Sequence, residues 1–94
     1  MYVRVVRFTE ATAERIASLR TRVEEAGGPP PGVRSNAITV LFDESQGTAV
    51  VLQHFETAED MHEAARVFSA MDPGETPGTR ASVDHCEVSL DLKN

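Results

Sequence analysis

The stretch "LQHFETAEDMHEAARVF", Leu52 to Phe68, decides the fold because it passes directly from a strand pattern into a helix start. The strand pattern, "TAVVLQHF" from Thr48 to Phe55, is rich in valine and ends on an aromatic residue. Thr57 then precedes Asp60 by three residues, a spacing close to that of a capping box, so a helix begins here and continues to about Met71. Its apolar residues recur at helical spacing and predict packing on a sheet: Ala58, Met61, Ala65 and Phe68.

The rest of the chain supplies three more strands and one more helix. Residues Tyr2 to Phe8 and Asn36 to Phe42 have strand patterns, and Ala81 to Leu92 alternates as a last strand. Ala11 to Ala26 has apolar residues at helical spacing and must stop at "GGPPPG", since proline lacks the amide donor. The order βαββαβ predicts an α+β, ferredoxin-like fold in one domain, residues 1–94. Its four-stranded antiparallel sheet carries both helices on one face.

The composition narrows the class of protein. Nine basic and fifteen acidic residues give a net charge of −6, which opposes binding to nucleic acid. The single cysteine, Cys86, rules out a disulfide within the chain and a site with several cysteine ligands. We find no apolar run long enough for a membrane and no secretion signal at Met1, so we expect a cytoplasmic protein without membrane or nucleic-acid partners.

The sheet face without helices needs a partner of its own. The second and third strands, which form the hairpin, carry apolar residues in both parities, so one set meets the helices and the other lies opposite them. Burial of each such side chain contributes about 1.5–3 kcal/mol. We therefore expect a two-fold homodimer in which the sheets pack face to face.

The element order, the segment "PPPGVRS", the hairpin "TVLFDESQGTAVVLQHF" and above all "LQHFETAEDMHEA" resemble the antibiotic biosynthesis monooxygenase domain of the dimeric α/β barrel superfamily. The resemblance covers nearly the whole chain. It implies a barrel built from two chains, with a cleft between sheet and helices in each. It also implies cofactor-independent oxygenation of an aromatic or polyketide-like small molecule. Phe55 stands where such enzymes commonly carry tryptophan, so it offers an apolar wall without an indole N–H.

Two histidines are candidate catalytic residues. His54 shares the strand parity of Val50 and Leu52, and an unperturbed histidine, with a pKa of about 6.5, suits proton transfer at neutral pH. A hydrogen-bonded structural histidine is the alternative. His62 flanks the apolar stripe of the second helix and points either into the cleft or into water. We expect His85 to face solvent, and the spacing of the three histidines predicts no metal site.

Four further residues are candidates for ligand binding. Phe55 and Met61 would form apolar walls, and Arg4 and Gln53 would supply polar groups from central strands. A buried arginine is seldom left without a counter-charge, so either a carboxylate such as Glu87 or an anion of the ligand should neutralise Arg4.

Two functions of different classes follow. One is a cofactor-independent monooxygenase with His54 or His62 as its polar participant. The other is a non-catalytic dimer that binds a small molecule or has a structural role and keeps only the fold, since a fold does not establish chemistry.

Overall fold

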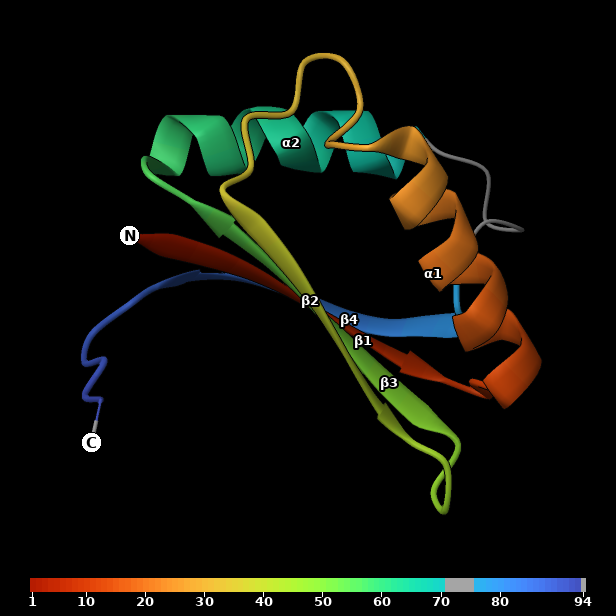
Figure 1. Cartoon of the computed structure of the whole chain (residues 1–94). Coiled ribbons are helices and arrows are strands. Elements are labelled where there is room, and N and C mark those ends of the chain that lie inside the picture. Colours follow the sequence, from red (N-terminus) through yellow and green to blue (C-terminus); the bar gives the residue numbers. More distant parts are fainter. Residues whose placement is uncertain (71–75, 94) are drawn as a thin grey trace.

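The computed structural model describes residues 1–70 and 76–93 and confirms the expected order of elements. In chain order these are β1 (Tyr2–Thr9), α1 (Ala13–Ala26), β2 (Ala37–Asp43), β3 (Thr48–Phe55), α2 (Ala58–Ser69) and β4 (Thr79–Glu87). The strands form one antiparallel sheet in the order β2-β3-β1-β4 (Figure 1). This is an α+β, ferredoxin-like architecture.

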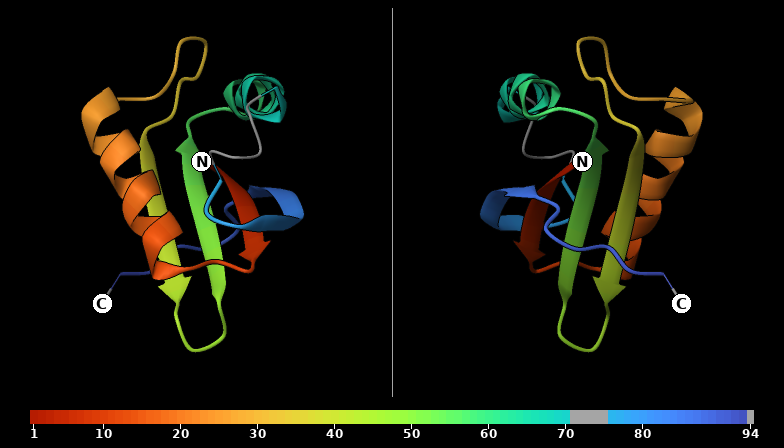
Figure 2. Two further views of the ribbon diagram at one scale, coloured as in Figure 1. Left: turned by 90° about the vertical axis from the view of Figure 1, so that its right-hand side faces the viewer. Right: turned by 90° about the vertical axis from the view of Figure 1, so that its left-hand side faces the viewer.

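Both helices lie over the same face of the sheet, and the opposite face carries no helix (Figures 1 and 2). Burial alternates strictly along β3, as expected for a strand whose two faces differ in cover. The register then assigns the paired residues of the two central strands, β1 and β3, to one face or the other. The buried residues of the two central strands that point to the helices are Arg4, Val6, Phe8, Ala49, Val51, Gln53 and Phe55.

The two helices contact the sheet to different extents. Met61 and Ala64 of α2 are buried and pack with Phe55 in one cluster of the core. Helix α1 has no buried residue, and only half-buried residues such as Ile16 and Leu19 reach the second cluster, around Val6 and Phe8. α1 therefore leaves space between itself and the sheet.

Local chemistry sets the ends of the helices. The hydroxyl of Thr12 accepts a hydrogen bond from the Arg15 amide at 3.2 Å, and Thr57 caps α2 in the same way. α1 ends at Gly27, whose φ of 68° is left-handed. α1 begins two residues later than expected, because the Ala11 amide donates to the Gly47 carbonyl of the β2–β3 turn instead of joining the helix. α2 ends at Ser69, and Met71 lies outside the described residues.

The last strand is displaced from its expected limits, Ala81 to Leu92. β4 starts earlier, because Thr79 still pairs with Thr9 at the end of β1, and it stops at Glu87, opposite Tyr2. β4 is an edge strand whose sole neighbour is β1. Beyond Glu87, the Val88 amide donates to the Met1 carbonyl at 3.0 Å.

The chain after β4 crosses the face of the sheet that has no helices (Figure 2, right). Two leucines of this segment, Leu90 and Leu92, are 75% and 78% exposed. The helix-free face of the sheet presents side chains such as Val5 and Leu52, which are only half-buried. This face is thus apolar in part and incompletely covered within one chain.

Candidate functional site

A cavity of about 1020 Å³ lies between α1 and the sheet, and a second of about 520 Å³ lies between α2 and β4. The larger volume matches the upper end of the range of about 300–1,000 Å³ that ligand pockets occupy. Its apolar walls come from β1, β3, α1 and α2 and include Val6, Phe8, Leu19, Val23, Val51 and Phe68. The two cavities share Arg4 and Arg80.

Arg4 and Gln53 form the polar centre of the helix-side face. They are directly opposite in the β1–β3 register, and Nη1 of Arg4 donates to Oε1 of Gln53 at 3.0 Å. Both residues are buried, with 4% and 5% of their surface exposed. The guanidinium also lies 5.2 Å from the centre of the Phe68 ring, within the range of a cation–π contact. The structure therefore brings these two predicted site residues together.

The charge of Arg4 has no counter-ion among the residues that the structure describes. The Nε atom is buried without a hydrogen-bond partner, and no salt bridge joins the guanidinium to a described carboxylate. Glu87, the expected partner, instead hydrogen-bonds the Tyr2 hydroxyl and raises the pKa of Tyr2. Burial, and then the positive charge of Arg80, lower the pKa of Arg4. Arginine nonetheless stays protonated in proteins, so a positive charge is buried here.

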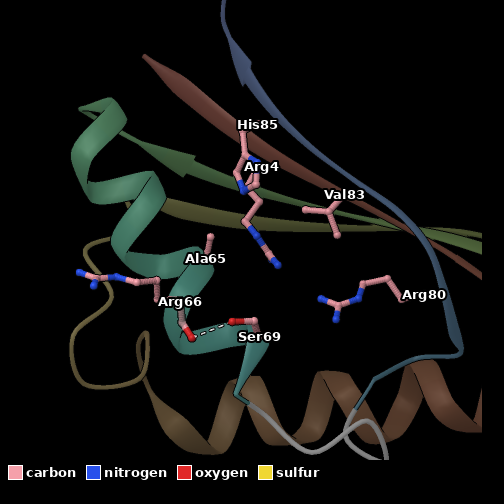
Figure 3. A pocket seen from close by; sticks show the side chains of 7 residues that line it. All are labelled: Arg4, Ala65, Arg66, Ser69, Arg80, Val83 and His85. Carbon is pink, nitrogen blue, oxygen red and sulfur yellow. Dashed lines mark hydrogen bonds between the residues drawn. The ribbon is translucent and has the colours of Figure 1, made fainter.

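His85 lies on the other side of Arg4, and the expectation that it is exposed to solvent is confirmed. It is opposite Arg4 in the β1–β4 register and lines the smaller cavity, although its side chain is exposed (Figure 3). Its ring makes an edge contact with His62, with 5.9 Å between the centroids. Partial burial, then the charges of Arg4 and His62, lower the pKa of His85 against the opposing effect of Asp84.

The position of Arg80 depends on the tight junction before β4. A Cβ atom at Gly78 would collide with the carbonyl oxygen of Thr9, so only glycine lets β4 start this close to the end of β1. From there the Arg80 side chain extends toward Arg4, whereas Arg66 extends to the far side of α2 (Figure 3). Arg66 forms an ion pair with Glu63. Arg4 and Arg80 are therefore the two cations directed into the smaller cavity.

The other predicted site residues lie elsewhere. His54 is on the opposite face of β3 from Gln53, so its side chain points away from both cavities; its carbonyl accepts from the Asn36 amide at 2.8 Å. Phe55 is fully buried and Met61 nearly so, and both belong to a closed part of the core that lines neither cavity. His62 lies at the site only through its contact with His85.

Sequence reasoning missed His85, Arg80 and the α1 wall of the larger cavity. The pattern of the last strand gave its alternation but not its register, and the register alone sets His85 opposite Arg4. Within the described part of the chain, no group of three or more histidine, cysteine or acidic residues could hold a metal ion.

Neither α1 nor α2 has the length and apolar character that a helix needs to span a membrane. In comparisons with known proteins, the sequence matches no protein family and no curated protein.

Proposed function

We propose that this protein binds a small, largely apolar organic molecule in the cleft between α1 and the sheet. The observation that carries the proposal is the cavity of about 1020 Å³ beneath a helix that buries none of its own residues. Leu19 and Val23 of α1 line this cavity and are only half-buried. A ligand would fill the space between α1 and the sheet and contact both of them. The complex would be stable because apolar surface is removed from water.

A neutral aromatic amide, naphthamide, tests this proposal. The chain has no tryptophan, so the fluorescence of the naphthalene ring reports binding directly. We expect saturable binding that weakens several-fold in Val23→Phe, which fills the cleft. Ala17→Phe, on the exposed side of the same helix, should leave it unchanged. Failure of naphthamide to bind at millimolar concentration, or equal binding by both variants, would refute the proposal.

Cofactor-independent oxygenation is a second candidate activity, and the position of His85 beside the smaller cavity, in contact with His62, favours it. In the quinone-forming oxygenation of a phenol, one atom of O₂ becomes the new carbonyl oxygen and the other leaves as water. The phenol supplies all four electrons. A base that removes the phenolic proton promotes this reaction, and His85 with His62 at its edge is placed for that role.

Oxygen uptake with a naphthol tests this second candidate. We expect His85→Ala and His62→Ala to lower the rate by about 10²-fold or more, the usual effect of losing a general base. His54→Ala, on the opposite sheet face, serves as the matched control and should retain activity. If the unmodified protein takes up no oxygen with the naphthol, the oxygenation candidate is wrong and only the proposal of ligand binding remains.

We also propose that two chains pair through the helix-free sheet face, as in dimeric α/β barrels. Three exposed leucines at or beside this face support the pairing: Leu41, Leu90 and Leu92. In such a dimer the partner would pack on the helix-free face of the sheet and hold in place the strands that form the floor of each cleft.

A further inference from the structure

The two cavities are lined by charge of one sign. Among the described residues, no aspartate or glutamate lines either of them. The arginines that do are Arg4, Arg15, Arg22, Arg66 and Arg80. The whole chain has fifteen acidic against nine basic residues, so this is the reverse of its average composition. A concave site lined by one sign of charge attracts the opposite charge.

Arg4 is the member of this set that most needs an anion. An ionised group that is 96% buried loses most of its hydration, and a neutral amide oxygen is its one hydrogen-bond acceptor among the described residues. Arg66 differs, because Glu63 already balances its charge. Burial of a cation without a described carboxylate is expected where a ligand supplies the negative charge.

The second cation and the apolar walls define what that ligand looks like. Arg80 extends toward Arg4 across the smaller cavity, so one oxyanion between them could contact both guanidinium groups (Figure 3). Val6, Phe8 and Val51 line the adjoining larger cavity, which an inorganic ion would leave empty. A planar carboxylate suits the planar guanidinium, and an apolar body suits these walls.

We infer that the ligand of this cleft is an organic acid whose carboxylate is held by Arg4 and Arg80, and whose aromatic or aliphatic body lies between α1 and the sheet. The inference rests on the proposed function and gives its ligand a chemical class. Arg4 acts as the buried anchor and Arg80 as the second contact nearer to solvent. Gln53 fixes the guanidinium through its hydrogen bond to Nη1.

The test compares naphthoate with naphthamide of the same substitution pattern, at constant ionic strength and near neutral pH. A hydrogen bond between charged groups predicts that the acid binds about 10-fold or more tightly than the amide. Arg4→Met should bring this ratio close to one, and Arg80→Met should lower it in part. Arg20→Met, on the exposed side of α1 and outside both cavities, should leave the ratio unchanged.

The possible outcomes separate this inference from the proposed function. If the amide binds as tightly as the acid, the cleft binds small molecules but the carboxylate assignment is wrong. If neither probe binds, both statements are wrong. If Arg4→Met does not fold, the variants Arg80→Met and Arg4→Lys decide. Lysine cannot reproduce the planar fork of donors with which arginine holds a carboxylate, so Arg4→Lys should bind naphthoate more weakly. The inference is overturned if Arg80→Met keeps the full preference for the acid and Arg4→Lys keeps the full affinity for naphthoate.

Discussion

Arg4 donates a 3.0 Å hydrogen bond from Nη1 to Oε1 of Gln53, which faces it across the β1–β3 pair on the buried, helix-facing side of the sheet. The adjacent residues on the same face, Val6 and Phe55, are apolar and buried. A cation and an amide at this position contribute less to folding than two apolar side chains would, because desolvation of a charge offsets much of its attraction. Their presence is explained by a ligand more readily than by stability.

Gln53→Leu should therefore destabilise the protein by about 1–3 kcal/mol, because it removes the hydrogen-bond acceptor of a buried cation. The double variant Arg4→Met/Gln53→Leu should recover that loss and approach or exceed the stability of the unmodified protein. Urea denaturation of the unmodified protein, both single variants and the double variant forms a complete double-mutant cycle. Additive losses in the cycle would show that the two side chains do not act as a pair.

Phe55 should matter for stability and not for binding, in contrast to its expected role as a cleft wall. Its side chain is fully buried beside Met61 and Ala64 and lines neither cavity. Phe55→Leu should lower the free energy of unfolding by about 1–3 kcal/mol through imperfect repacking. The affinity of the folded variant for naphthamide should stay unchanged in fluorescence titration. If the fully folded Phe55→Leu variant binds naphthamide more weakly than the unmodified protein, Phe55 contributes to the binding site.

The stability of the protein should fall as His85 is titrated. In the folded protein, burial and the charge of Arg4 hold the pKa of His85 below its ordinary value. The unfolded chain takes up this proton near pH 6.5, where the folded protein still excludes it, so the unfolded state binds more protons. The free energy of unfolding therefore decreases as the pH drops from about 6.5 through the lower, folded-state pKa.

His85→Gln should flatten this dependence in urea denaturation between about pH 7.5 and 5.5, above the range in which most carboxylates titrate. His54→Gln is the matched control, because its side chain lies on the opposite face from Arg4 and cannot report on the site. An equal slope in His85→Gln and the unmodified protein would contradict the predicted role of His85.

The fold could be predicted because each element carries its own local signal. Thr57 marks the start of α2, and the alternation of β3 marks a strand with two unequal faces. The candidate site could be predicted only in part, at Arg4 and Gln53, because a polar residue in a central strand requires a partner whatever the details of packing. His85 was missed because strand register is a long-range property, set here by pairing across more than eighty residues of sequence.

The helix-free face gives the last prediction. Leu52 points out of this face from a central strand and is half-buried, whereas Ile38, on the neighbouring strand, faces the helix side. If two chains pair through this face, Leu52→Glu places a charge in the interface of each, and desolvation without a partner should weaken the dimer by about 10-fold or more. Ile38→Glu should leave the dimer intact. Sedimentation equilibrium at micromolar concentration distinguishes the two variants. An unmodified protein that sediments with the mass of one chain would rule out the pairing.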